Sequence, residues 1–557
     1  MTGWDATYDV VIVGSGGGGM VAALAATAAG ARTLVLEKQE KVGGSTCMSG
    51  GILWVPNNSV MRKAGEVDSY EDALIHFETV VGDVGACSSL ERRHAFLTAG
   101  PEMVDFLVDV GVRLVYCRGY SDYYSSAKGG HDIGRGVEPV PFNGRVLGPW
   151  LEQLQPGLAQ SLGLSVMTNE ARSLSNFNRS PRAFAISARV VMRTTAARLR
   201  RQALLTNGAS LIAQTLKVAL ERGVSVWTEA PLEDLVVENS KVVGVRTIKN
   251  GQPAMIRAVR GVVLASGGFA HNAEMRQQYG GDQPNKGRWT MSNPGDTGEV
   301  IQTAMRLGAK TDLMDEAWWL PSPKTGRFTQ STLDQARQRP RAIYVDAAGQ
   351  RFVNESNSYM EVGKAMYARN KTIKAVPCWL IFDDRYRKRY AHQRSRPGHF
   401  PKSLRESGLL KQAPTLEELA RQCEIDPQGL VATVEHFNVG ARQGVDPDYG
   451  RGESAYNRAL GDPNRRVHPC LGPLDEAPYY AVQVLPGDIG TCGGLLTNEH
   501  AQVVGQDDQP IEGLYATGNG TATVMGRHYL GPGASIANTM VFGYVAARHA
   551  MGADQQV

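Results

Sequence analysis

Residues 8–19 read YDVVIVGSGGGG, a short β-branched run followed directly by a glycine-rich turn. Within it, Gly14, Gly16 and Gly19 form the spacing GxGxxG. A strand, this turn and a helix follow one another in the order that a dinucleotide-binding βαβ unit requires. Gly14 permits the tight turn, Gly16 lets the backbone approach a pyrophosphate, and Gly19 lets the helix pack closely on the strand. We therefore predict a strand over 8–13 and a helix over 20–29 whose N-terminal N–H groups face the phosphates.

A second strand is predicted over 32–36, and Glu37 follows it, eighteen residues after Gly19. An acid at this place can accept a hydrogen bond from a ribose hydroxyl. A second glycine-rich segment comes at once, which is common in FAD proteins and unusual in NAD dehydrogenases. From these two loops the residues predicted to bind the cofactor are Gly14, Ser15, Gly16, Gly17, Gly18, Gly19, Glu37, Lys38, Gly43, Gly44, Ser45, Thr46, Ser49, Gly50 and Gly51.

Two later segments repeat the change from an apolar run to glycine. Residues 262–264 lead into ASGG at 265–268, and GLYATGN occupies 513–519. They add Gly267, Gly268, Gly518 and Asn519 to the predicted cofactor site. Because these elements are spread from one end of the chain to the other, we predict one cofactor domain closed by both termini. The middle of the chain is then an insertion, and the predicted class is α/β, with a Rossmann-like FAD-binding domain split by an α+β cap domain.

Composition excludes several other classes of protein. The 59 basic and 55 acidic residues leave a net charge of +4, too small for the whole chain to be a nucleic-acid binder. The seven cysteines include no CxxC pair, so we expect reduced thiols in the cytoplasm and no zinc site or disulfide framework. No apolar run reaches about 18 residues, so no membrane-spanning segment is expected. The absence of HxxH, GxSxG and GxxxxGK[ST] patterns argues against metal, serine-hydrolase and ATPase chemistry.

These motifs together resemble the fumarate reductase/succinate dehydrogenase flavoprotein family. The resemblance rests on VVIVGSGGGGM at 10–20, GGST at 43–46, SGG at 49–51, VVLASGGF at 262–269, NPGDTGE at 293–299, CGGLLTN at 492–498 and GLYATGN at 513–519. It implies an FAD-binding domain over 1–319 and 491–557 and a catalytic cap over 320–490 that covers the flavin. Some relatives attach the flavin to a histidine near GGST. Residues 44–48 read GSTCM, without histidine, so a dissociable FAD is expected.

The segment MGRHYLGPG at 525–533 indicates the substrate class. Dicarboxylate reductases of this family carry a stretch like HGxNRLGGN, whose arginine clamps a carboxylate. Aligned on the LG pair, that arginine becomes Tyr529. A guanidinium suits a planar carboxylate, whereas a phenol suits one neutral oxygen. The substitution argues against succinate or fumarate and for a ketone.

A narrower resemblance is to the 3-ketosteroid Δ1-dehydrogenases. It is carried by the YxGPG pattern at 529–533, YSDYY at 120–124, RFVNES at 351–356 with a following tyrosine at 359, GILWVPNN at 51–58 and FDDRYRKRY at 382–390. Leu530 departs mildly from relatives that have proline there. The resemblance further assigns Ala534, Ser535 and Ile536 to the cofactor.

That family removes two hydrogens from C1 and C2 of a 3-keto-4-ene steroid. The resemblance implies that Tyr359 takes the C2 proton while the C1 hydrogen leaves as hydride to flavin N5. It also implies that the Tyr529 hydroxyl and the Gly533 N–H bind the C3 oxygen as an oxyanion hole. Tyr120 is expected to pack on the steroid face. A phenol of pKa ~10 is a weak base at neutral pH, so Tyr123 is expected to share its proton. A nearby cation or helix N-terminus would lower the pKa.

Alternatives remain at this point. They are a ketosteroid desaturase acting at C4–C5, a fumarate-reductase-like enzyme, and a flavin- or steroid-binding protein without catalysis. The leading interpretation needs an external electron acceptor such as a quinone, and suits sterol or steroid degradation. A long-side-chain substrate such as cholest-4-en-3-one is slightly favoured by the segment described next.

Residues 161–202 are strongly basic and amphipathic. They contain a single acid, Glu170, and eight arginines, at positions 172, 179, 182, 189, 193, 198, 200 and 201. Apolar residues are interleaved among them. Such a stretch can lie on an anionic membrane surface, or it can be a surface excursion whose apolar side packs on the protein.

Overall fold

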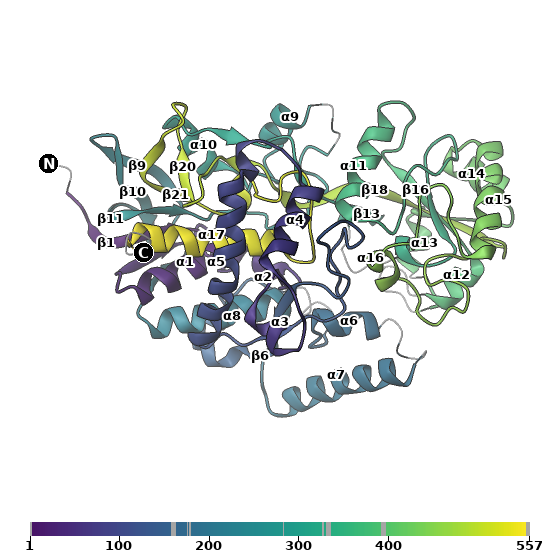
Figure 1. Cartoon of the computed structure of the whole chain (residues 1–557), viewed down its shortest axis with the longest axis horizontal. Helices are drawn as coiled ribbons and strands as arrows, with labels where there is room; N and C mark the ends of the chain where they lie inside the picture. The colour runs from purple at the N-terminus through teal and green to yellow at the C-terminus, as the bar shows by residue number, and fades with distance from the viewer. Residues whose placement is uncertain are drawn as a thin grey trace.

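A parallel sheet forms the centre of the larger half of the molecule (Figure 1). The computed structural model describes residues 3–157, 163–174, 177, 180–281, 283, 285–325, 328–329, 336–390, 397–400 and 402–552. Strand β1 (Ala6–Val13) lies between β2 (Thr33–Leu36) and β11 (Gln252–Leu264). Beyond these lie β8 (Ser225–Trp227) and β21 (Pro510–Ala516), also parallel to their neighbours. The predicted α/β class is confirmed, because segments from both ends of the chain share one sheet.

Two helices cover the sheet where the glycine-rich turn ends. α1 (Gly17–Ala28) begins three residues before the predicted start, because the GxGxxG turn itself forms its first turn. It packs against α17 (Ala534–Ala550), the C-terminal helix. A Cβ on Gly18 would lie 2.7 Å from the Thr539 carbonyl oxygen. Glycine here lets the first and last helices of the chain touch through their backbones.

Further elements surround this core. An antiparallel extension pairs β9 (Leu232–Glu238) with β10 (Lys241–Lys249) and β10 with β11, and β20 (Gln502–Val504) pairs with β21. The other helices and strands of this half are α2 (Gly44–Met48), β3 (Leu53–Trp54), α3 (Ser59–Lys63), α4 (Tyr70–Val80), α5 (Leu90–Asp109), β4 (Leu114–Tyr116), β5 (Gly136–Pro139), β6 (Phe142–Asn143), α6 (Thr168–Leu174), α7 (Pro181–Leu199), β7 (Leu204–Leu205), α8 (Asn207–Glu221), α9 (Ala273–Gly280), α10 (Glu299–Arg306), β12 (Thr311–Asp312) and β19 (Gly494–Leu495).

A second, antiparallel sheet builds the smaller half, on the right in Figure 1. Its long strands β13 (Ala317–Thr325) and β18 (Tyr479–Thr491) pair with each other and connect the two halves. The sheet is completed by β14 (Phe328–Thr329), β15 (Ala342–Val345), β16 (Cys378–Asp383) and β17 (Leu410–Ala413). Its helices are α11 (Tyr359–Asn370), α12 (Asp384–Arg389), α13 (Lys402–Glu406), α14 (Leu416–Cys423), α15 (Pro427–Gln443) and α16 (Ala455–Ala459). The domain limits at 320 and 490 stay a prediction.

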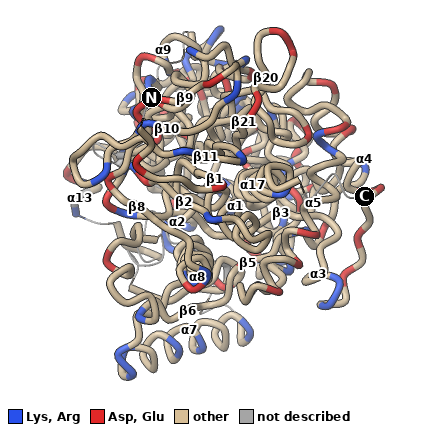
Figure 2. The backbone as a smooth tube through the Cα atoms, turned by 90° about the vertical axis from the view of Figure 1, so that its left-hand side faces the viewer, with Lys and Arg blue, Asp and Glu red and all other residues tan. Residues whose placement is uncertain are grey.

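The basic segment 161–202 contains α6 and α7. Residues 161, 162, 175, 176, 178 and 179, which include Leu162 and Arg179, lie outside the described residues, as does the Arg172 side chain. α7 runs along the outside of the molecule, and basic positions recur along it (Figure 2). In the described part of the chain, we find no helix with the length and apolarity that crossing a bilayer requires.

Candidate active site

A cavity of about 710 Å³ runs between the glycine-rich turns and the second sheet. All five residues predicted to act on or bind the substrate line it, namely Tyr120, Tyr123, Tyr359, Tyr529 and Gly533. Most of the predicted cofactor residues line it too. These are Gly14, Ser15, Gly16, Gly17, Glu37, Lys38, Gly44, Ser45, Thr46, Ser49, Gly50, Gly51, Gly267, Gly518, Asn519, Ser535 and Ile536.

The end of the cavity beside α1 has the chemistry of a pyrophosphate site. Gly14 has φ +109°, and a Cβ there would lie 2.3 Å from the Ala265 carbonyl oxygen, so only glycine fits the turn. The N-cap of α1, Gly16, supplies no side-chain acceptor, and Gly16 and Gly17 line the cavity at this helix end. The Gly17 N–H donates to Thr46 Oγ1 at 3.1 Å, and the other backbone donors of this helix N-terminus can bind an anion. The residues present fit the diphosphate of FAD.

Glu37 lies beside this turn at the end of β2. Its Oε2 accepts hydrogen bonds from the Ser15 hydroxyl and, at 3.2 Å, from the Ser15 N–H, and its Oε1 accepts one from the Gln39 N–H. The side chain is buried, so these contacts fix the carboxylate at the cavity wall. Its predicted hydrogen bond to a ribose stays a prediction.

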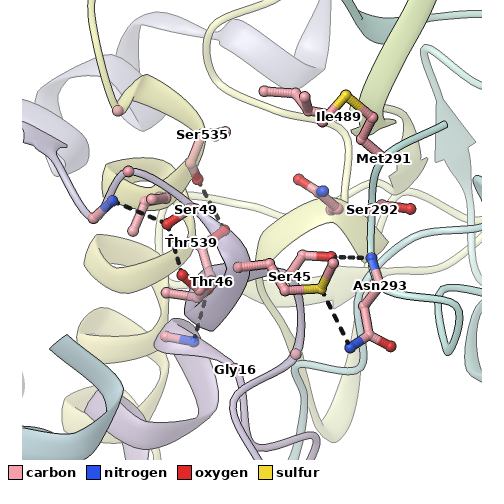
Figure 3. A pocket seen from close by; sticks show the side chains of 18 of the residues that line it. Gly16, Ser45, Thr46, Ser49, Met291, Ser292, Asn293, Ile489, Ser535 and Thr539 are labelled. Atoms are coloured by element: carbon pink, nitrogen blue, oxygen red, sulfur yellow. Dashed lines mark hydrogen bonds between the residues drawn. The ribbon is translucent and has the colours of Figure 1, made fainter. Parts of the chain in front are cut away.

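Residues of the NPGDTGE motif form the opposite wall. Ser45, on α2, accepts from the Asn293 N–H at 2.8 Å and donates to Asp296 Oδ2 at 3.0 Å. Figure 3 shows Ser45 and Thr46 on one side of the cavity and Ser292 and Asn293 on the other. Burial raises the pKa of Asp296 to about 7. Sequence reasoning quoted this motif but gave Asn293 and Asp296 no role, although the motif was the signal that could have found them.

The remaining predicted cofactor residues do not line the cavity. They are Gly18, Gly19, Gly43, Gly268 and Ala534. A Cβ on Gly19 would lie 2.0 Å from the Gly14 carbonyl oxygen, and one on Gly268 would lie 2.1 Å from Thr491 Oγ1. These glycines therefore allow close packing of the turns that form the site.

Three tyrosines from distant parts of the chain meet at the other end of the cavity. The ring centroids of Tyr123 and Tyr359 lie 5.2 Å apart, those of Tyr359 and Tyr529 5.1 Å, and those of Tyr123 and Tyr529 5.5 Å. Tyr359 is the first residue of α11, in the second half of the molecule. A backbone hydrogen bond from the Tyr123 N–H to the Leu530 carbonyl fixes the other two segments together. Tyr529 is buried and Tyr123 and Tyr359 are partly buried, and the three form one cluster.

Two further aromatic residues complete this cluster, and sequence reasoning missed both. The Tyr456 ring lies 4.5 Å from that of Tyr123, and Trp318 packs edge-on against Tyr529 at 5.0 Å. Tyr456 also lines the cavity. No sequence pattern distinguishes these two positions from the other aromatic residues, because only the fold brings them to the site.

Burial raises the pKa of two phenols of this cluster. Burial, followed by the neighbouring Tyr123 and Tyr529, raises the pKa of Tyr359 well above its ordinary value. The pKa of Tyr123 is also raised, chiefly by burial, although its hydrogen bond with Tyr359 acts in the opposite direction. Tyr359 is the first residue of α11, so a helix N-terminus of the kind that could lower its pKa is present. The net direction of the shift is nevertheless upward, and burial is its largest cause.

Gly533 lies directly before α17, with φ +86°. Its N–H belongs to a helix end whose backbone donors lack intrahelical acceptors. A Cβ on Gly533 would lie 2.0 Å from the Ile52 carbonyl oxygen. Contact with this neighbouring backbone therefore requires glycine at 533 whether or not a substrate approaches its amide. The Tyr529 hydroxyl lies 2.9 Å from Ser535 Oγ on the same side of the cavity.

Tyr120 borders the cavity from the 120–124 segment. Its hydroxyl donates to the Thr168 carbonyl at 2.7 Å, at the start of α6. α6 itself lines the cavity with Thr168, Ala171 and Leu174, and Met167 directly before it does so too. The arrangement ties the basic segment to the substrate end of the site. Packing of Tyr120 on a bound substrate stays a prediction.

A model of the FAD binding domain matches residues 9–536. The chain is 42% identical to a 3-oxosteroid 1-dehydrogenase of Mycobacterium tuberculosis (strain ATCC 25618 / H37Rv), covering 97% of this chain and 98% of that protein. It is 40% identical to the enzyme of the same name from Mycolicibacterium smegmatis (strain ATCC 700084 / mc(2)155), over 98% of this chain and 97% of that protein.

The chain belongs to the flavoprotein family of the 3-oxosteroid 1-dehydrogenases. The structure agrees. A crystal structure of the 3-ketosteroid Δ1-dehydrogenase of Sterolibacterium denitrificans, in complex with 1,4-androstadiene-3,17-dione, matches with a TM-score of 0.91 and 36% identity. The match covers 98% of this chain and 100% of that one. Like other members of this family, the protein is an FAD-dependent oxidoreductase.

Proposed function

We propose that this protein desaturates the C1–C2 bond of 3-keto-4-ene steroids and yields 1,4-dien-3-ones. The observation that carries the proposal is the meeting of Tyr123, Tyr359 and Tyr529 with Gly533 on one cavity that also contains the FAD site. The Tyr529 phenol and the Gly533 N–H suit a ketone oxygen, and the Tyr359 phenol provides a base. The names of the relatives support the same reaction.

Four residues of the chain have distinct roles in this reaction. Tyr529 and Gly533 hold the C3 oxygen and stabilise the negative charge that develops there when C2 loses its proton. The Tyr359 hydroxyl oxygen, as phenolate, accepts that proton, and Tyr123 shares the hydrogen bond. When bound, FAD supplies the two-electron acceptor for the hydrogen that leaves C1. The C2–H electron pair forms the new C1–C2 double bond, and the C1–H electron pair leaves with the hydrogen.

The test is anaerobic mixing of the purified, flavin-loaded protein with androst-4-ene-3,17-dione and with cholest-4-en-3-one. We expect the flavin absorbance to fall with both steroids and a 1,4-dien-3-one to form. A faster reaction with cholestenone than with androstenedione would support a long-side-chain substrate. Reduction by succinate or reoxidation by fumarate, with no response to either steroid, would contradict the proposal. Inertness to all of them would indicate a binding protein. Reoxidation by a quinone would support that class of external acceptor.

We further propose that α7 rests on an anionic membrane surface. Four large apolar side chains on one of its faces are strongly exposed, Phe184 at 62%, Val191 at 52%, Met192 at 65% and Leu199 at 81%. The opposite face, with Ala183, Val190, Thr194 and Ala197, is buried on the protein. An apolar face flanked by arginines suits a bilayer surface.

α7 is connected to an element that lines the cavity. Arg193 pairs with Glu170 at 2.9 Å and so joins α7 to α6, whose residues line the cavity. A water-insoluble sterol partitions into a bilayer, so a protein docked through α7 would have its substrate end close to the lipid. The membrane contact would therefore help the protein collect its proposed substrate. A cytoplasmic location, with contact at the membrane surface only, stays a prediction.

Replacement of Phe184 and Leu199 by glutamine should release the protein from vesicles of phosphatidylcholine and phosphatidylglycerol. Each apolar side chain withdrawn from lipid removes about 1.5–3 kcal/mol, so partitioning of the double variant should fall about a hundredfold or more. Co-sedimentation of the protein with the vesicles measures this partitioning. The matched control is Val439→Gln on α15, since Val439 is also strongly exposed but lies on the other half. Unchanged co-sedimentation of the double variant, or of a chain without 161–202, would contradict the contact.

A further inference from the structure

A polar cluster lies behind the catalytic tyrosines, and Glu361 is at its centre. Glu361 Oε1 accepts a hydrogen bond from the Tyr124 hydroxyl at 2.8 Å and pairs with Lys364 Nζ at 2.7 Å. His528 Nε2 lies 3.9 Å from the same oxygen, and its ring packs edge-on against that of Tyr124. About a quarter of the side chain of Glu361, Lys364 and His528 is exposed, so the cluster lies at the edge of the core.

The members of this cluster are neighbours in sequence of the three catalytic tyrosines. Tyr124 follows Tyr123 directly, and His528 directly precedes the tyrosine of the oxyanion hole. Glu361 lies in the first turn of α11, which begins at Tyr359. One carboxylate thus faces all three segments that carry the catalytic phenols.

Lys364 extends the connection to the third segment. Its Nζ donates to the Arg527 carbonyl at 2.8 Å, and the Arg527 guanidinium donates to Asp315 at 2.8 and 3.0 Å. Burial and the charge of Lys364 lower the pKa of His528 to about 4, so this histidine is neutral at pH 7. Lys364 is therefore the cation that faces Glu361, and together they tie α11 to the 527–529 segment.

We propose that Glu361 is a positioning residue that sets the distance between the Tyr359 base and the oxyanion hole. The ring contacts fix how the tyrosines tilt, but α11 belongs to the second half of the molecule and the other two tyrosines to the first. The hydrogen bond from Tyr124 to Glu361 and the one from Lys364 to the Arg527 carbonyl join these halves, and Glu361 lies within two residues of the base. A small displacement of a catalytic group can cost as much as a hundredfold in rate. The inference rests on the proposed function.

Two variants test it. Glu361→Gln keeps the size and an acceptor oxygen but removes the charge, and Tyr124→Phe removes only the hydroxyl. Each should lower kcat about tenfold or more while KM changes little, because the steroid contacts remain. The kinetic isotope effect for substrate deuterated at C2 should increase relative to that at C1, since proton removal is what becomes slower. The double variant should be no slower than the slower single one, because both changes break one connection.

The matched control is Glu221→Gln. Glu221 pairs with Lys217 at 2.7 Å on α8, away from the cavity, and its loss should leave kcat and both isotope effects unchanged. Flavin content and melting temperature are measured for every variant. Wild-type kinetics in flavin-loaded Glu361→Gln and Tyr124→Phe would overturn the positioning role alone. A loss of rate that only follows a loss of flavin or stability would also overturn it. A wild-type protein that desaturates no 3-ketosteroid would overturn the proposed function itself, and this inference with it.

Discussion

Replacement of Tyr359 by phenylalanine should lower kcat about 10³-fold, because a positioned general base contributes 10²- to 10⁴-fold. The change removes one oxygen atom and leaves the ring contacts with Tyr123 and Tyr529 in place. Flavin content should stay at the wild-type level, because Tyr359 is not among the residues predicted to bind the cofactor. Stopped-flow flavin reduction by androst-4-ene-3,17-dione measures the effect.

The raised pKa of Tyr359 gives the wild-type protein a characteristic pH dependence. Burial favours the neutral phenol, so only a small fraction is ionised at pH 7. The rate of reduction should therefore rise with pH, by about tenfold per unit while pH stays below that pKa. The residual rate of Tyr359→Phe should lose this slope.

The matched control for Tyr359→Phe lies on the same helix. Tyr367, two turns further along α11, donates to the Pro486 carbonyl at 3.3 Å and does not line the cavity. Tyr367→Phe should keep both the rate and its pH slope. A fall in rate common to both variants would point to α11 as a whole, and an unaffected Tyr359→Phe would rule out this tyrosine as the base.

Tyr529→Phe should lower kcat/KM by about 10²- to 10³-fold, the usual cost of removing one oxyanion-hole donor. The ring would still pack against Trp318 and the other tyrosines, while the Ser535 hydroxyl would lose its partner at 2.9 Å. Because Gly533 would remain as a single donor, the variant should retain measurable activity. The same flavin-reduction assay, run over a range of steroid concentrations, gives the value.

The charge that Tyr529 stabilises can also be probed directly. A phenolic steroid A-ring carries a hydroxyl at the place of the C3 oxygen, and its affinity should fall in Tyr529→Phe. The matched control is Tyr544→Phe on α17, since Tyr544 accepts from Arg548 at 3.1 Å and lies outside the cavity lining. Wild-type kinetics in Tyr529→Phe would show that the hydroxyl does not contact the C3 oxygen.

The cofactor half of the site was largely predictable, because its chemistry is local. The turn at Gly14 and Gly16, the helix that follows and the strand that ends at Glu37 are set by short-range backbone geometry, which a glycine spacing records directly. Asn293 and Asp296 were visible in a quoted motif but received no role. Their position opposite Ser45 depends on the fold, which brings residues about 250 positions apart to one wall.

The sequence by itself determined the class of the fold and the FAD cofactor, and it predicted the cofactor-binding residues and the tyrosines of the site, because motifs preserve local chemistry. Only the tertiary structure brought Tyr123 and Tyr359 together, since the contact joins the segment between β4 and β5 to the first residue of α11 and no local pattern encodes it. The structure alone also added Tyr456 and gave the direction of the Tyr359 pKa. Burial is a property of the packed chain, so the direction of this pKa shift could not be predicted from the sequence.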